Sequence, residues 1–424
     1  MTTIEPEKIH KALADLRAEG YDFLRSLTGM DWGEEGLGVV YHIEKTSTGE
    51  NKVVKTATTN RENPELPSVC DIWKAAEFNE REVYDFLGIR FIGHPDMRRL
   101  YLREDWVGHP FRKDYDESLN PLRMTNEEPD DATHHFEELP DGSVIKKREV
   151  IFDEDEYIIN IGPQHPATHG VLRFRVSLEG EIIKKLDVHC GYIHRGIEKM
   201  CESLTYPQTL ALTDRLDYLG AHQNRHALCM CIEKAMGIEV SDRVQYIRTI
   251  MDELQRIDSH LLFFSCLCMD LGALTAFFYG FRDREKILDI FEATTGGRLI
   301  QNYNTIGGVQ YDIAPDFVQK VKEFIAYLRP MLREYHEVFT GNVIANGRLK
   351  GVGILSREDA ISFGATGGTG RASGWACDVR KRHSYAMYGK VDFKEIVRTE
   401  GDCFARYMVR MEEIMESMNI IEQL

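Results

Sequence analysis

The stretch from Ser241 to Asp270 reads SDRVQYIRTIMDELQRIDSHLLFFSCLCMD, and it decides the class of fold. Its apolar residues recur at spacings of three and four, which is the period of an amphipathic helix. Ser241 and Asp242 are the residue types that begin helices, so we predict one long helix over 241–270. No run of the chain approaches the ~18–20 apolar residues that a membrane helix needs. The apolar part, 261–281, carries Asp270 and is therefore interpreted as a buried helical region.

The same helical period dominates the chain around this stretch. Patterns of this kind cover 206–236, 282–294 and 317–339. Before these helical patterns, three short runs are rich in apolar and β-branched residues and predict strands: 157–161, 171–178 and 182–189. The second part of the chain is thus expected to be mostly α-helical, with a small sheet near its beginning.

The first part of the chain predicts a small α+β unit. A helix is expected over 5–19, strands over 39–43 and 53–56, and a helix over 68–87 that Ser68 caps and Gly88 ends. From 114 to 156 the sequence is acidic, contains three prolines and lacks periodicity, which is typical of a solvated linker. The predicted organisation is therefore α+β, with domains at 1–115 and 157–424 joined by an acidic linker at 116–156.

Composition excludes several classes of function. The 424 residues are 43% hydrophobic and 29% charged, which is ordinary for a globular protein. The formal net charge of −17 argues against nucleic acid as a partner, since phosphate binding requires a basic surface. The first ten residues are polar and lack the apolar core of a signal peptide. We expect a cytosolic chain, or one that meets a membrane through partners.

The cysteine and histidine spacings do not favour a metal site. Nine cysteines are present, but no C-x-x-C pair occurs. Cys229/Cys231 and Cys266/Cys268 are two apart, so on a helix they face different directions. His222 and His226 share a helix face, but no third ligand is evident. The glycine-rich run 364–370 lacks the following lysine of a phosphate-binding loop, so we predict neither a metal nor a nucleotide site.

A turn between two predicted strands is the first candidate for chemistry. It reads Gly162-Pro-Gln-His165-Pro-Ala-Thr-His169-Gly170. Glycine and proline fix an unusual backbone path, which is how a loop presents side chains to a site. One of the histidines either donates a proton or hydrogen bond to a substrate, or is a structural histidine with its hydrogen bonds satisfied within the fold.

Two further groups stand on predicted helices. In Asp214-Arg215-Leu-Asp217-Tyr218 the first and last residues are four apart and would share a helix face. A buried tyrosine is a plausible proton donor, whereas such a charged patch alone is more often a structural ion-pair network. Asp270 closes a strongly apolar run, and a carboxylate buried there needs a partner such as a histidine.

Longer motifs resemble a known family. The run Glu80-Arg-Glu-Val-Tyr-Asp-Phe-Leu-Gly88, followed by Phe91-Ile-Gly-His94-Pro, resembles the C subunit of NADH:quinone oxidoreductase, respiratory complex I. Gly108-His-Pro-Phe-Arg-Lys-Asp-Tyr115 extends this resemblance. Other segments resemble the D subunit of the same complex: the loop 162–170, His194-Arg-Gly-Ile-Glu-Lys199, the segment 214–218, Arg371-Ala-Ser-Gly374 and Asp378-Val-Arg-Lys381. The resemblance implies a fused C/D subunit.

The D subunit is similar in fold to the large subunit of nickel–iron hydrogenases, which supplies the main alternative. A hydrogenase would need R-x-C-x-x-C to hold its metals through thiolates. This chain has Arg215-Leu-Asp217-Tyr-Leu-Gly220, so Asp217 and Gly220 occupy the thiolate positions. A hydrogenase-related scaffold without a cofactor remains a third interpretation.

The resemblance assigns roles to individual residues. It implies that His169 and Tyr218 hydrogen-bond the carbonyls of a quinone and that Asp270 is the partner of His169. Arg215 corresponds to an arginine beside the terminal iron–sulfur cluster, which a neighbouring subunit holds. The implied partners are the other peripheral-arm subunits, including that iron–sulfur subunit, and the membrane-arm subunits. NADH would be used by the complex and not bound by this chain, which would lie at the cytoplasmic face of a bacterial inner membrane.

Two departures from the family pattern stand out. Ile300 occupies a place where the family often has a histidine near the cluster, and the loss of that charge would suit a low-potential quinone such as menaquinone. The chain ends at Leu424, whereas D subunits run about a quarter longer in this domain. We therefore expect a C-terminally truncated sequence, lacking a tail that normally completes the sheet and part of the quinone cavity.

Overall fold

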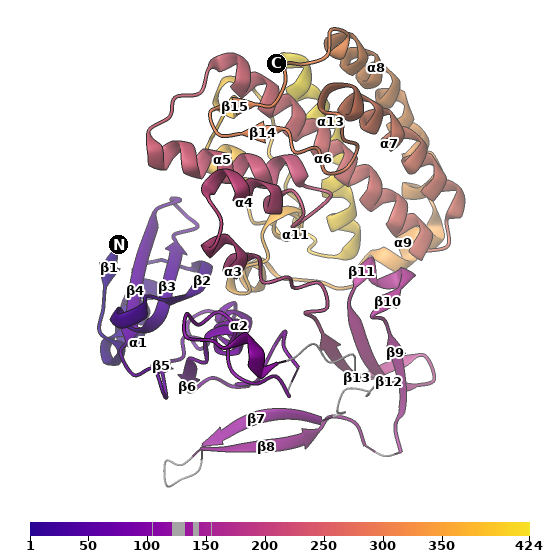
Figure 1. Cartoon of the computed structure of the whole chain (residues 1–424). Helices are drawn as coiled ribbons and strands as arrows, with labels where there is room; N and C mark the ends of the chain where they lie inside the picture. Colours follow the sequence, from indigo (N-terminus) through magenta and orange to yellow (C-terminus); the bar gives the residue numbers. More distant parts are fainter. Residues whose placement is uncertain (104, 121–131, 139–143, 154) are drawn as a thin grey trace. The chain divides into compact units, whose positions relative to one another are not determined.

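The computed structural model describes residues 1–103, 105–120, 132–138, 144–153 and 155–424 (Figure 1). They form two compact units: Met1–Gly196 with Ile361–Gly364, and Ile197–Ala360 with Ala365–Leu424. The first unit contains most of the strands and the second most of the helices, so the predicted α+β class is confirmed. The sequence-based boundaries at 115 and 156 stay a prediction.

The first unit begins with a four-stranded sheet and two helices. The strands are β1 (Thr2–Thr3), β2 (Phe23–Asp31), β3 (Leu37–Glu44) and β4 (Asn51–Thr58), in the order β1-β4-β3-β2. β1 runs parallel to β4, and the other pairs are antiparallel. The helices are α1 (Pro6–Ala18) and α2 (Ala76–Leu87), with a short 3-10 turn η1 at Gly33–Glu35. Buried residues of both helices and of β2, β3 and β4 form one apolar core.

The prediction of a helix over 68–87 is correct only for its second half. α2 spans Ala76–Leu87, and the following Gly88 takes the left-handed conformation that often follows a helix. Ser68 is not the cap of this helix, because its hydroxyl donates to Oε2 of Glu80 at 2.7 Å. The residues 68–75 form turns instead, held by a carboxylate from the helix that follows them.

Smaller strand pairs complete the first unit. β5 (Glu65–Pro67) pairs with β6 (Arg90–Ile92), and β7 (Ala132–Glu138) with β8 (Val144–Val150). β9 (Tyr157–Ile161), β12 (Arg173–Glu179) and β13 (Ile182–His189) form a sheet in the order β13-β12-β9. β10 (Gln164–His165), η3 (Pro166–Thr168) and β11 (Gly170–Val171) lie between β9 and β12, and η2 is Glu117–Leu119. The three predicted strands of this region are confirmed.

The stretch interpreted as a solvated acidic linker contains the β7–β8 pair. The N–H of Phe136 donates to the carbonyl of Met97 at 3.3 Å, and its ring meets that of Tyr84 edge-on with centroids 5.5 Å apart. Residues 121–131 and 139–143 of the predicted linker lie outside the described residues. Strand pairing here was missed because composition dominated the sequence interpretation.

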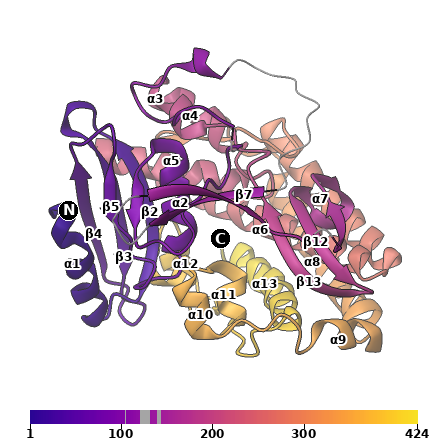
Figure 2. The same cartoon turned by 90° about the horizontal axis from the view of Figure 1, so that it is seen from below.

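The second unit is built mostly from helices (Figure 2). They are α3 (Ile197–Glu202), α4 (Tyr206–Thr213), α5 (Ala221–Met236), α6 (Asp242–Asp270), α7 (Leu274–Thr295), α8 (Phe317–Tyr335), α9 (Val343–Leu349), α11 (Gly367–Ala372), α12 (Val379–Arg382) and α13 (Cys403–Gln423). The largest apolar core of this unit is formed mainly by α6, α7, α8 and α13. α10 (Arg357–Ser362) contributes residues to both units. β14 (Asn304–Thr305) pairs with β15 (Gly308–Val309), η4 (His336–Thr340) is a π-helical turn after α8, and η5 is Tyr388–Lys390.

The long predicted helix is confirmed as α6, and Ser241 caps it by accepting from the N–H of Val244. Its buried face packs with α7, α8 and α13 in the core. α7 begins at Leu274, earlier than the predicted 282, and the pattern at 206–236 is divided into α4 and α5. Among the described helices, none combines the length and the apolarity that spanning a membrane requires.

Candidate functional site

The loop 162–170 is closed by its own backbone. β10 and β11 pair antiparallel within it, and the hydroxyl of Thr168 lies 2.8 Å from the carbonyl oxygen of His165 and 2.9 Å from that of Gly170. Gly162 has φ +94°, and a Cβ there would lie 1.9 Å from the carbonyl oxygen of Leu172. A side chain at 162 would therefore displace the backbone. The expectation that glycine fixes the path of this loop is confirmed.

The two histidines of the loop differ in their surroundings. His165 accepts a hydrogen bond from the N–H of Ala167 through Nδ1, at 3.1 Å, so its ring helps to shape the turn. His169 takes the left-handed conformation at the end of η3, with φ 49°, and its side chain is exposed. Both side chains are exposed, and the geometry gives His165 a structural role in the turn.

A pocket of about 390 Å³ adjoins this loop within the first unit. It is lined by Tyr101, Thr168, Gly170, Val171, Leu172, Cys190, Gly191, Ile193 and His194. Aliphatic and aromatic groups make up most of the wall, with the Thr168 hydroxyl, the Cys190 thiol and the His194 imidazole as polar groups. This volume and lining are typical of sites for small, largely apolar ligands.

The far wall of the pocket is held by aromatic packing and one carboxylate. The His194 ring packs against both Phe86 and Tyr101, with centroids 4.6 and 5.1 Å away, and those two rings stack on each other at 5.7 Å. Buried Asp85 accepts from the N–H of Tyr101 at 2.7 Å. Gly191 packs against Tyr101 so closely that a Cβ would lie 2.5 Å from its carbonyl oxygen. Sequence reasoning missed this wall because its two segments are far apart in the chain.

The segment 214–218 is a turn between α4 and α5, so the prediction that it is helical is wrong. The side chains of Asp214 and Tyr218 consequently do not share a helix face. Asp214 is 1% exposed and accepts from Nη1 of Arg225 at 3.2 Å, whereas Tyr218 is 54% exposed. Burial raises the pKa of Asp214 despite that arginine. One residue of the motif anchors the turn and the other lies at its surface.

The remaining residues of this turn are exposed. Arg215 donates through Nη1 to the carbonyl of Ala211 at 2.5 Å, and its side chain lies at the surface. Oδ1 of Asp217 accepts from the N–H of Leu219 at 2.9 Å, which stabilises the turn. In place of the two cysteines of an R-x-C-x-x-C motif, the chain thus carries a turn-stabilising carboxylate at 217 and a glycine at 220.

Asp270 is the last residue of α6, and its side chain is exposed rather than buried. The expectation of a buried carboxylate rested on the apolar run before it, but that run turns its buried face, including Phe264 and Cys268, away from the position of Asp270. His169 belongs to the first unit, and Tyr218 and Asp270 belong to the second. The predicted pairing of His169 with Asp270 therefore stays a prediction.

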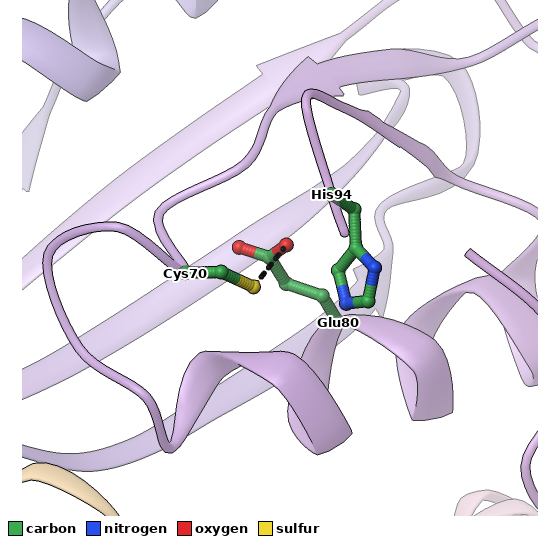
Figure 3. Close-up of side chains that lie close together, drawn as sticks. All are labelled: Cys70, Glu80 and His94. Carbon is green, nitrogen blue, oxygen red and sulfur yellow. Dashed lines mark hydrogen bonds between the residues drawn. The ribbon is translucent and has the colours of Figure 1, made fainter. Parts of the chain in front are cut away.

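Three possible metal ligands meet in the first unit, on and beside α2 (Figure 3). They are Cys70, Glu80 and His94, whose ligand atoms lie within 4.8 Å of one another. Nδ1 of His94 accepts from the N–H of Asp96 at 2.9 Å, and Nε2 lies 2.9 Å from the carbonyl of Glu77. Both ring nitrogens are thus engaged, and Glu80 accepts from the Cys70 thiol. The arrangement is a hydrogen-bonded turn more than a metal centre.

The cysteine pair of α5 and the two histidines of that helix differ in their surroundings. Cys229 is buried and Cys231 exposed, so they face different directions. His222 and His226 are both buried on α5, and in the part of the chain that the structure describes no third ligand joins them. Instead Nδ1 of His226 lies 2.7 Å from Oδ2 of the buried Asp252.

Comparison with known proteins identifies the family. Residues 2–120 match the family model described as respiratory-chain NADH dehydrogenase, 30 Kd subunit, and residues 270–424 match that of the 49 Kd subunit. The chain is 88% identical to the C/D subunit of NADH-quinone oxidoreductase from Phocaeicola vulgatus, over 99% of this chain and 81% of that protein. The same subunit of Bacteroides fragilis is 75% identical over 99% of this chain and 82% of the relative. The C/D 2 subunit of Aquifex aeolicus is 40% identical over 92% and 68%. This chain therefore belongs to the family of NADH-quinone oxidoreductase C/D subunits.

Proposed function

We propose that this chain forms the quinone-reduction site of its complex. In this proposal the imidazole of His169 and the hydroxyl of Tyr218 donate hydrogen bonds to the two carbonyl oxygens of the quinone, and Asp270 is the partner of His169. The relatives, which are named as C/D subunits of NADH-quinone oxidoreductase, support the substrate class. The observation that carries the proposal is the closed loop that presents an exposed His169 beside the apolar pocket.

The chemistry requires proton donors at both ends of the quinone. Reduction to the quinol adds two electrons and two protons, and each carbonyl oxygen becomes a hydroxyl. A donor at each oxygen stabilises the charge that develops when electrons arrive, and so favours the reduced state. The imidazole of a histidine exchanges protons near neutral pH, and a carboxylate beside it restores its proton from solvent. Tyr218 is half-exposed in its turn and is therefore accessible to a substrate.

Electrons would come from an iron–sulfur cluster that a partner subunit holds. Arg215 is exposed beside Tyr218, so its guanidinium is available to a partner surface. A fixed positive charge near a cluster stabilises the reduced cluster and raises its potential. The partners in this proposal are the iron–sulfur subunit, the other peripheral-arm subunits and the membrane-arm subunits, with the chain at the cytoplasmic face of the membrane. NADH would be oxidised elsewhere in the complex.

A low-potential quinone such as menaquinone fits this chain. Ile300 lies partly exposed where the family often has a histidine, and a neutral side chain there supplies no charge to raise the cluster potential. Its neighbour Arg298 is already paired with Glu285, Asp289 and Glu292. Rates measured with menaquinone and ubiquinone analogues would test this choice, and a clear preference for ubiquinone would contradict it.

The central experiment measures quinone reduction by membranes that contain the assembled complex. His169→Ala and Tyr218→Phe are expected to lower the rate about 100- to 10,000-fold, the usual cost of losing a positioned proton donor, without loss of assembly. Tyr206→Phe is the matched control, because Tyr206 is 69% exposed in the same unit as Tyr218 and has no proposed role. Normal rates in both site variants would favour the alternative, a cofactor-free scaffold related to the hydrogenase large subunit.

A further inference from the structure

The turn that carries Tyr218 is held in place from α5. Arg225, in the second turn of that helix, donates through Nη1 to the carbonyl of Leu210 at 2.9 Å and to Oδ2 of Asp214 at 3.2 Å. Its Nε donates to the carbonyl of Asn304. One buried guanidinium thus joins the end of α4, the first residue of the turn and the β14 strand. The position of the Asp214–Tyr218 turn therefore follows the position of the start of α5.

Buried polar contacts fix α5 on α6 near both of its ends. Near the start, Asp252 takes part in two of them: its carbonyl accepts from Nε2 of Gln223 at 2.8 Å, and its carboxylate meets Nδ1 of His226 at 2.7 Å. Near the end, Arg248 donates to both carboxylate oxygens of Glu233, at 2.7 and 3.0 Å. The side chains of His226 and Asp252 are each 1% exposed, so water does not compete for their bond.

The chemistry of this bond assigns distinct roles to the two ring nitrogens of His226. We assign the proton of this contact to Nδ1 of His226, because a carboxylate such as that of Asp252 accepts hydrogen bonds. Nε2 is buried and has no hydrogen-bond partner among the described residues. The connection between α5 and α6 at this point therefore depends on Nδ1, and a donor placed at the Nε2 position cannot replace it.

We infer that His226 is a positioning residue for the proposed quinone reaction, acting through Asp252 to hold the start of α5 and with it the turn that presents Tyr218. This inference rests on the proposed function of Tyr218. His226 touches neither substrate nor cofactor in this scheme, and its contribution is to the placement of the tyrosine hydroxyl. A misplacement of about 1 Å at such a donor costs about 100-fold in rate.

Two substitutions distinguish the roles of the two ring nitrogens of His226. In His226→Asn the side-chain amide lies where Nδ1 was and still donates to Asp252, whereas in His226→Gln it lies near the former Nε2. We expect the assembled His226→Asn complex to keep its kcat within about threefold, and His226→Gln to lower kcat about 10- to 100-fold with a much smaller change in KM. Equal rates in the two variants would overturn the inference.

A matched control lies at the other end of the same helix. Glu233→Gln disturbs a buried contact between α5 and α6 that is distant in sequence from Tyr218, so it is expected to lower the thermal midpoint but not kcat per assembled complex. A loss of kcat in Glu233→Gln equal to that in His226→Gln would mean general destabilisation and would overturn the positioning role. Tyr218→Phe in the same assay distinguishes a failure of the proposed function from a failure of the positioning role of His226. Normal kcat in Tyr218→Phe defeats both proposals, whereas low kcat there with normal kcat in His226→Gln defeats the positioning role alone.

Discussion

Glu80 is a fully buried carboxylate whose hydrogen bonds come from neutral donors. Its oxygens accept from the Ser68 hydroxyl and the Val69 N–H at 2.7 Å each, and from the Cys70 thiol at 3.4 Å. These bonds lower its pKa, but burial outweighs them and raises the pKa to about 7. The side chain that organises the turn before α2 is therefore costly to ionise at neutral pH.

The raised pKa of Glu80 predicts a pH dependence of stability. In the unfolded chain the carboxyl group of Glu80 has its ordinary pKa of 4.5, so the folded chain binds this proton more tightly. The resulting contribution to the free energy of unfolding is fully present below pH 4.5 and is lost as the pH rises through about 7. The effect amounts to about 3 kcal/mol across that window. Glu80→Gln, which is uncharged throughout, is expected to flatten this part of the curve of unfolding free energy against pH.

Urea denaturation of the full chain at several pH values between 4 and 8 measures this effect. Glu34→Gln is a suitable control, because Glu34 is an exposed glutamate in η1 of the same unit. If the curve for Glu80→Gln parallels that of the unchanged protein, Glu80 does not titrate in this range and the prediction is contradicted.

At the scale of elements, α2 approaches β2 at a glycine. A Cβ on Gly29 would lie 2.6 Å from Cδ1 of Leu87 and 2.9 Å from Cγ1 of Val83. The leucine methyl group lies at the end of a flexible side chain, but valine is stiff about its first torsion, so the helix itself would have to move. The absence of a side chain at 29 thus sets how closely the helix packs on the sheet.

Gly29→Ala is therefore expected to destabilise the first unit by about 1–3 kcal/mol, the usual cost of overpacking a core. Val83→Ala removes the stiff methyl groups, so the double variant should lose less stability than the sum of the two single losses. Chemical denaturation of the three variants measures this coupling. Strict additivity would show that the two positions do not compete for space.

The element scale also shows what the sequence could predict. The period of Ser241–Asp270 sufficed for α6, because nothing inside it favours another conformation. The helical spacing of apolar residues over 206–236 does not reveal the turn between α4 and α5. Asp217 stabilises that turn by accepting from the N–H of Leu219. The aspartate and the following Gly220 were the available signals. Ser68 was misassigned because its partner is Glu80, twelve residues away.

Some features of the candidate site could likewise be predicted from the sequence, and others could not. The glycines and prolines of 162–170 predicted a fixed loop, and local hydrogen bonds confirm it. The exposure of Asp270 could not be predicted, because it depends on which side of α6 faces the core. The pocket brings Tyr101 together with residues 168–172 and 190–194, and no local pattern encodes such long-range contacts.

At the scale of the whole molecule, the two units have separate cores. The apolar cluster of the first unit is drawn from residues 4–136, and the largest cluster of the second from 247–421. The second also contains a buried ionic centre. Glu253 accepts from Arg380 at 3.0 Å, from the Tyr388 hydroxyl at 2.5 Å and from the Ser417 hydroxyl at 2.6 Å, and so connects α6 with α13.

Separate cores predict separate unfolding transitions in calorimetry of the full chain. Burial raises the pKa of Glu253, but the charges of Arg256 and Arg380 outweigh it and hold the value at about 2. This stabilisation is present above pH 4.5 and is lost as the pH falls toward 2. At pH 7, Glu253→Gln leaves Arg380 with reduced compensation, at a cost of about 3–5 kcal/mol. Glu253→Gln should therefore lower the midpoint of the transition of the second unit, whereas Gly29→Ala should lower the midpoint of the transition of the first unit. A single transition that both variants shift equally would mean that the units unfold as one, because the substitutions lie in cores that share no residue.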